Sequence, residues 1–178
     1  MRLEIWVEKD ALSTVVSRAA QPYRIVVSPS RGYSSYSSIK DSIDERFAEQ
    51  PEKPTVILLL SDCDPSGLDI KVDLEKRFDK YAEWLDITVK RIALTFYQVR
   101  QYNLIPNPVK SADTHVPKYI EQFGDACYEL DAIDPVEFQR LVTTAIEAHV
   151  DMTAWNQGIR REQKERDEIG KWFENLDL

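Results

Sequence analysis

With 178 residues, of which 43% are apolar and 30% charged, the chain has the composition of one globular domain, or of one domain with an appendage. Its formal net charge of −8 argues against a general nucleic-acid binder, because such proteins usually present a basic surface. No segment approaches the roughly 18 consecutive apolar residues of a membrane span, so we expect no membrane partner.

The cysteines and the first residues bear on the cellular compartment. Cys63 and Cys127 do not form the paired spacing that a thiolate zinc site requires. The apolar part of residues 1–7 is too short for a signal peptide, and it carries Glu4. We therefore expect a cytoplasmic protein whose thiols are reduced.

The first predicted strand covers residues 3–7, where alternate apolar residues share one face. A helix should follow to about residue 20, since apolar side chains recur there at helical spacing. A second strand is predicted at residues 23–27. An amphipathic helix is predicted at residues 34–50, after a polar and turn-prone segment.

The central predicted strand is the unbroken apolar run at residues 55–60, which is typical of a strand covered on both faces. Asp64 and Pro65 have the pattern of an N-cap and a first helical residue, so a helix should run from there to about residue 81. A fourth strand is predicted at residues 87–94. The alternation of strands and helices indicates an α/β fold, a Rossmann-like parallel sheet of about four strands sandwiched by helices.

Downstream, residues 95–118 are proline-rich and show little periodicity, which predicts a long connection of the kind that is often functional. A short helical end before Gly124 and a short strand at residues 126–130 should follow. Residues 1–133 would thus form one domain. Glu129 and Asp131 either extend an acidic cluster or form the solvent face of the short strand.

Residues 134–178 should form a mostly helical C-terminal extension. Asp134, Pro135 and Glu137 predict the start of a helix that reaches about residue 150. The segment from about residue 152 to 176 is highly charged and has only a thin apolar face, which predicts a helix at the surface or facing a partner.

Three acidic residues follow two of the predicted strands. Glu8 comes after the first strand, and Asp62 and Asp64 come after the third, where open α/β sheets bind ligands. Carboxylates held one residue apart repel each other unless a cation or a proton lies between them. Oxygen ligands suit Mg²⁺, which would polarise a phosphodiester while a carboxylate moves a proton. The alternative interpretation has no metal site: Asp64 only caps a helix, and Glu8 is a solvated acid at the end of a strand.

Three motifs in order make the chain resemble the toprim domain. They are Val-Glu-Lys-Asp-Ala-Leu at residues 7–12, a glycine loop at residues 30–33, and Asp-Cys-Asp-Pro-Ser-Gly-Leu-Asp-Ile at residues 62–70. Toprim domains are the metal-binding modules of topoisomerases, bacterial primases and several nucleases. The third motif resembles that of the type IIB topoisomerase catalytic subunits, and later segments are similar to free-standing toprim proteins of phages and mobile elements. The resemblance covers about residues 3–134.

The resemblance implies a role for each matching residue. Glu8 would act as the general acid or base and help to hold Mg²⁺, or Mn²⁺, with Asp62 and Asp64 as its ligands. Gly67 and Asp69 match later positions of the same motif, where Asp69 would support the ligands or would simply be a surface acid.

Four other residues are candidates for contact with the substrate. Gly32 matches the loop glycine of the family, where the missing side chain would let the backbone approach a phosphate. Lys9, Arg31 and Lys110 would bind phosphate, or would be solvated cations.

The main functional hypothesis is Mg²⁺-dependent phosphodiester chemistry on DNA or RNA, in its simplest form a nuclease. The alternative is a non-catalytic toprim subunit that binds metal and nucleic acid and acts with a separately encoded topoisomerase-like or ATPase partner. We consider it because the topoisomerases carry their nucleophilic tyrosine on another domain, for which we expect no room before Leu3. A phospho-receiver domain is a weaker interpretation, because Lys9 separates the acids at residues 8 and 10.

Overall fold

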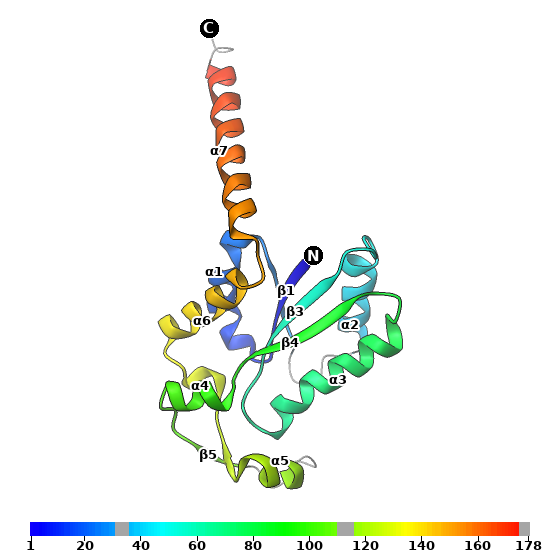
Figure 1. Cartoon of the computed structure of the whole chain (residues 1–178), viewed down its shortest axis with the longest axis vertical. Helices are drawn as coiled ribbons and strands as arrows, with labels where there is room; N and C mark the ends of the chain where they lie inside the picture. Colours follow the sequence, from blue (N-terminus) through cyan, green and yellow to red (C-terminus); the bar gives the residue numbers. More distant parts are fainter. Residues whose placement is uncertain (31–35, 110–115, 175–178) are drawn as a thin grey trace. The chain divides into compact units, whose positions relative to one another are not determined.

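The computed structural model describes residues 1–30, 36–109 and 116–174 (Figure 1). The chain divides into two compact units, Met1–Thr143 and Thr144–Leu178. The first unit contains the sheet and every candidate site residue that the structure describes. The second unit contains the end of helix α6 and all of helix α7.

The four strands of the main sheet are parallel and lie in the order β2-β1-β3-β4. Their bounds are β1 (Arg2–Val7), β2 (Val26–Pro29), β3 (Thr55–Leu60) and β4 (Ile87–Ala93). Val7 pairs with Leu60, so β1 and β3 end at the same level. The predicted four-stranded parallel α/β sheet is therefore confirmed.

Helices and short elements connect and follow these strands. The helices are α1 (Ser13–Ala20), α2 (Tyr36–Ser42), α3 (Pro65–Tyr81), α4 (Phe96–Gln101), α5 (Val116–Phe123), α6 (Pro135–Glu147) and α7 (Met152–Glu174). A π-helical turn at Ile43–Phe47 extends α2, and 3-10 turns occur at Asp10–Leu12, Gln21–Tyr23 and Leu130–Ala132. A small antiparallel pair consists of β5 (Asn107–Pro108) and β6 (Ala126–Cys127).

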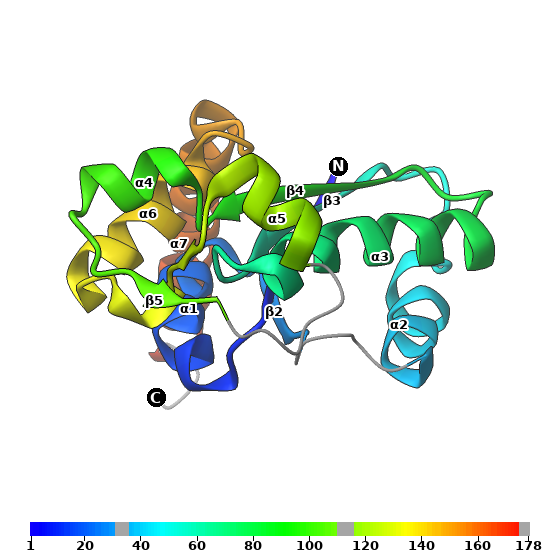
Figure 2. The ribbon, with the colours of Figure 1, turned by 90° about the horizontal axis from the view of Figure 1, so that it is seen from below.

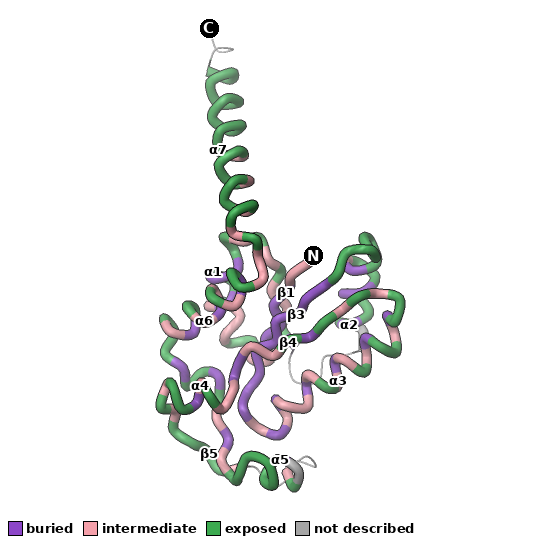
Figure 3. Tube along the Cα trace, viewed as in Figure 1, coloured by how far each residue is buried: buried purple, intermediate pink, exposed green. Residues whose placement is uncertain are grey.

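The core follows from the strand patterns. All six residues of β3 are buried, as a strand covered on both faces requires (Figure 3). Trp6, Ile57 and Leu59 point to one face, where they pack against apolar residues of α2, its π-helical extension and α3. Helix α3 runs alongside β4 (Figure 1, Figure 2). The helix α1 buries Val16 and contacts β1 and β2.

Three predicted elements differ in the structure. The second strand starts at Val26 instead of residue 23, because Gln21–Tyr23 form a 3-10 turn that ends at Arg24 with a φ of 55°. The connection at 95–118 contains α4, whose start is fixed by a capping box between Thr95 and Gln98. The strand predicted at residues 126–130 is only two residues long and is followed by a 3-10 turn.

Two helix starts were predicted correctly. The Asp64 side chain accepts a hydrogen bond from the Gly67 amide at 2.6 Å, with Pro65 in the first turn of α3. Asp134 accepts hydrogen bonds from the amides of Val136 and Glu137 at the start of α6. None of the helices within the described ranges combines the length and the apolar character that crossing a membrane needs.

Candidate functional site

The ends of β1 and β3 bring Glu8 and Asp62 together. The Glu8 amide donates to the Leu60 carbonyl at 2.9 Å, and the Asp62 amide donates to Glu8 Oε2 at 2.9 Å. Two residues that lie 54 positions apart in sequence thus share one edge of the sheet. The predicted meeting of these two acids at the carboxyl ends of the strands is present in the structure.

Asp64 completes the acidic edge. Its side chain caps α3 and, together with Glu8 and Asp62, lines a cavity of about 520 Å³. The other lining residues come from the first turn of α3 and from the β5–β6 region: Pro65, Ser66, Asn107, Pro108, Cys127, Tyr128 and Glu129. Asp64 therefore caps α3 and also lines the cavity. The interpretation of Asp64 as a helix cap does not exclude its interpretation as a metal ligand.

Residues 61–64, which connect β3 to α3 and carry Asp62 and Asp64, are called the acidic loop here. Close packing of α3 on this loop requires glycine at position 67. A Cβ at this position would lie 2.3 Å from the Asp62 carbonyl oxygen and 3.0 Å from the Asp62 amide nitrogen. The Ser61 hydroxyl also donates to the Gly67 carbonyl at 2.8 Å. The first turn of α3 therefore fixes the backbone of Asp62, and only glycine fits this contact.

Asp62 is almost fully buried, with 7% of its surface exposed. Its Oδ1 accepts a hydrogen bond from the Leu130 amide at 2.7 Å, and its Oδ2 lies 3.4 Å from Lys9 Nζ. Burial raises the pKa of Asp62, while the Leu130 amide and the Lys9 ammonium oppose this rise. Protein donors thus engage both oxygens of this carboxylate.

Lys9 is an internal counterion at this edge. Besides Asp62, its ammonium contacts Glu129 Oε2 at 3.1 Å and Asp131 Oδ1 at 3.0 Å. Burial lowers the pKa of Lys9, but the hydrogen bonds to Asp131 and Glu129 outweigh this effect and the pKa is raised. Lys9 therefore stays charged and holds the 129–131 segment against the acidic loop. The sequence analysis expected a phosphate contact or a solvated cation at Lys9, and it did not foresee this internal ion pairing.

Arg91 contacts the loop that carries Asp62 and Asp64, and the sequence analysis did not single it out. It extends from β4 and donates to the Ser61 hydroxyl and to the Asp62 carbonyl, both at 2.9 Å, and also to the Leu94 carbonyl. Its guanidinium thereby fixes the loop that carries the acids. A basic residue close to the end of the predicted fourth strand was the available signal.

The β5–β6 region forms a further wall of the site. Cys63 and Tyr128 exchange backbone hydrogen bonds of 2.8 and 3.0 Å, and the Tyr119 hydroxyl donates to the Cys63 carbonyl at 3.0 Å. These contacts join the acidic loop to residues more than 50 positions away in sequence. No local sequence pattern predicts these contacts of Cys63 with Tyr119 and Tyr128.

The pKa of Glu8 is raised from its ordinary value of 4.5 to about 7. Burial is the largest cause, and the charges of Asp62 and Asp64 add to it, while the hydrogen bond from the Asp62 amide opposes it. A carboxyl group that titrates close to neutral pH can both give and take a proton. The role of proton donor or acceptor that the toprim resemblance implies for Glu8 is compatible with this pKa.

The raised pKa of Glu8 predicts that stability in metal-free buffer falls as the pH rises from about 5 to 8. In that window the unfolded chain has lost the Glu8 proton and the folded chain still binds it, so ionisation costs the folded state about 1 to 3 kcal/mol. Urea unfolding followed by circular dichroism at several pH values measures this slope. Glu8→Gln should flatten it, whereas Glu75→Gln, which removes a surface acid paired with Lys71, should not.

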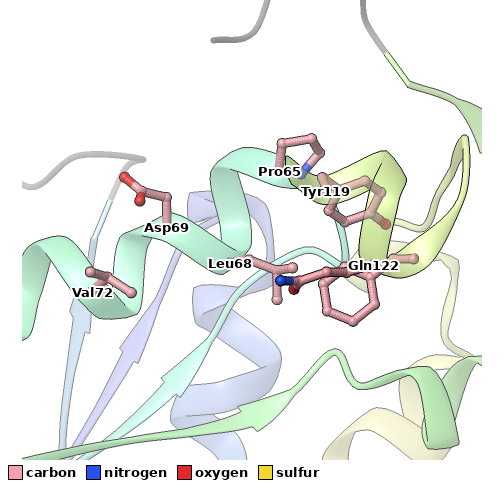
Figure 4. Close-up of a pocket in the computed structure, with 7 residues that line it drawn as sticks. Pro65, Leu68, Asp69, Val72, Tyr119 and Gln122 are labelled. Atoms are coloured by element: carbon pink, nitrogen blue, oxygen red, sulfur yellow. The ribbon is translucent and has the colours of Figure 1, made fainter. Parts of the chain in front are cut away.

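The other predicted site residues lie elsewhere or are not described. Asp69 is one helical turn beyond the acids and lines a separate pocket of about 240 Å³ between α3 and α5, with Pro65 and Tyr119 nearby (Figure 4). Arg31, Gly32 and Lys110 lie outside the described residues. The structure therefore brings together Glu8, Lys9, Asp62, Asp64 and Gly67.

The suitability of the edge for Mg²⁺ rests on its donor chemistry. Within residues 1–30, 36–109 and 116–174, no group of three or more His, Cys, Asp or Glu side chains is arranged to hold a metal ion. Each of the three acids instead accepts a hydrogen bond from a backbone amide. The carboxylate oxygens of Glu8, Asp62 and Asp64 line one cavity, and hard oxygens are the ligands that Mg²⁺ prefers.

No protein-family model matches the chain. No curated protein matches it either. The toprim-like motifs and the geometry of the acidic edge are therefore the features that bear on function.

Proposed function

We propose that this chain is a toprim-type protein that performs Mg²⁺-dependent phosphodiester chemistry on nucleic acid, in its simplest form strand cleavage. One observation supports the proposal above all: the Asp62 amide donates to Glu8 Oε2, so acids from the ends of β1 and β3 share one cavity with Asp64. Those three acids are the ones that the toprim-like motifs single out.

In this proposal, different residues of the acidic edge bind the metal, transfer the proton and position the backbone. Asp62 and Asp64 would hold Mg²⁺, or Mn²⁺, which would supply Lewis acidity toward a phosphodiester. Glu8 would move the proton, since burial raises its pKa to about 7 in the metal-free protein. Arg91 and Gly67 keep the backbone of Asp62 in place. Arg31, Gly32 and Lys110 remain proposed phosphate contacts.

The substrate is proposed to be DNA or RNA, bound locally and not through a general basic surface. The net charge of −8 would repel a polyanion, so productive binding has to rely on the metal and a few nearby cations. We also propose a cytoplasmic location, because Cys63 and Cys127 are buried and form no disulfide with each other.

A second candidate is a non-catalytic toprim subunit that acts with a separately encoded partner. The position of Lys9 favours it, because the ammonium group already contacts Asp62 and would compete there with a divalent ion. In that case Lys9 would neutralise the acidic edge in place of a metal ion, and the partner would carry out the chemistry.

Cleavage by the purified full chain separates the two candidates. The assay uses single- and double-stranded DNA and RNA with Mg²⁺, with Mn²⁺, and with a chelator. We expect metal-dependent products from at least one substrate and none with the chelator. Absence of cleavage under every metal condition would favour the non-catalytic subunit.

Metal binding is tested separately by thermal unfolding. Millimolar Mg²⁺ or Mn²⁺ is expected to raise the melting temperature of the wild type, because a ligand that binds only the folded state stabilises it by about 2.7 kcal/mol at 100 times its Kd. Asp62→Asn should lose most of this shift, and Glu75→Gln should keep it. An equal shift in all three proteins would place the metal outside the acidic edge.

A further inference from the structure

Helix α7 (Met152–Glu174) is long and buries none of its 23 residues. Most of its length is exposed in Figure 3. Its apolar residues Ile159, Ile169, Trp172 and Phe173 are between 40% and 60% exposed. An isolated helix gains little stability in water without burying an apolar face, so this helix requires an explanation.

Six residues of α7 form one stripe along the helix. Their spacing alternates between four and three residues, which is the spacing of a coiled-coil seam. The stripe consists of Trp155, Ile159, Glu162, Arg166, Ile169 and Phe173. Its apolar members lie at the two ends, and an acid and a base lie in the middle.

The sequence around Lys164 is self-complementary when read outward in both directions. Of the six residue pairs within six positions of Lys164, five are alike or opposite in charge, and the exception is Gln163 with Glu165. The five pairs are Glu162 and Arg166, Arg161 and Asp167, Arg160 and Glu168, Ile159 and Ile169, and Gly158 and Gly170. In two antiparallel helices, residues at equal distance from the centre lie at the same level, so this pattern matches a helix to a reversed copy of itself.

We propose that α7 pairs with α7 of a second copy of this chain as an antiparallel coiled coil centred on Lys164. In this arrangement Ile159 packs against Ile169 of the second copy, and Trp155 packs against its Phe173. Glu162 faces Arg166 of the second copy in the middle of the seam. Two-fold symmetry repeats each of these contacts, as an isologous interface requires.

The two glycines of α7 support the pairing. A Cβ on Gly158 or Gly170 would meet nothing within 4 Å, so the chain's own packing does not demand glycine at either position. In a helix interior, glycine is less favourable than alanine. Both flank the stripe, where the missing side chain leaves room for the helix of a second copy and its aromatic residues.

Charge complementarity selects a second copy over another apolar partner. An unrelated apolar helix would leave Glu162 and Arg166 facing apolar side chains, which is costly for charged groups. A reversed α7 presents the opposite charge to each of them. Within one helix Arg166 already contacts Glu162 at 2.8 Å, so the two side chains lie on the same face. The pairing would extend this ion pair into a four-residue network.

Sedimentation equilibrium of the full chain tests the proposal. We expect a reversible dimer over a range from about 1 to 300 µM, since a short seam of this kind gives micromolar affinity. Ile159→Asp should weaken the dimer by about 100-fold or more, because it places charges in the apolar part of the seam. Gln157→Asp, which places the same charge on the outer face, should leave the dimer intact.

Charge reversal tests the identity of the partner. Glu162→Arg and Arg166→Glu should each weaken the dimer by roughly 10-fold or more, because like charges then meet across the seam. The double variant restores opposite charges and should recover most of the affinity. Circular dichroism of every variant verifies that α7 stays helical. A wild-type chain that is monomeric at the highest concentration, or a dimer unchanged by Ile159→Asp, overturns the proposal.

Discussion

Glu8→Gln is expected to lower metal-dependent cleavage by roughly 100- to 10,000-fold, the usual contribution of a positioned general acid or base. The amide keeps the size of the side chain and can still accept the hydrogen bond from the Asp62 amide, but it cannot take or release a proton near neutral pH. The initial rate of product formation on the best substrate measures the effect.

Two controls make the Glu8 result specific. Glu75→Gln removes an exposed acid of α3 that pairs with Lys71, and should leave the rate unchanged. The free energy of unfolding of Glu8→Gln at pH 8 should equal or exceed that of the wild type, because the substitution removes a buried charge. Cleavage at the wild-type rate by Glu8→Gln would show that Glu8 has no part in the chemistry.

Gly67→Ala is expected to destabilise the first unit by about 1 to 3 kcal/mol, in the range of over-packed core positions, and to abolish metal binding. Its Cβ would lie 2.3 Å from the Asp62 carbonyl oxygen. This oxygen belongs to the backbone, which moves less easily than the end of a flexible side chain. Either α3 or the acidic loop has to shift, which moves Asp62 away from Glu8. Urea unfolding and the Mg²⁺-induced thermal shift measure the two effects.

Gly170→Ala is the matched control for Gly67→Ala. A Cβ at Gly170 would meet nothing within 4 Å, and alanine favours the helix. At low protein concentration, where α7 would be unpaired, this variant should be at least as stable as the wild type. Equal stability of Gly67→Ala and wild type would mean that the contact between α3 and Asp62 relaxes without cost.

The sequence predicted those parts of the fold and site that depend on local pattern. The apolar run of β3 gave the buried central strand, and Asp64 with Pro65 gave the start of α3. Glu8 and Asp62 could be placed at one edge because parallel strands in one sheet end on the same side. The missed α4 also carried a local signal, the capping box at Thr95 and Gln98.

Only the tertiary structure decided how the acids are surrounded. Lys9 lies 120 and 122 residues from its partners Glu129 and Asp131, and Arg91 reaches the acidic loop from another strand. The pKa of Glu8 depends mainly on burial, which no spacing in the sequence records. Periodicity and capping are properties of neighbouring residues, whereas desolvation and ion pairing depend on which distant segments the fold packs together.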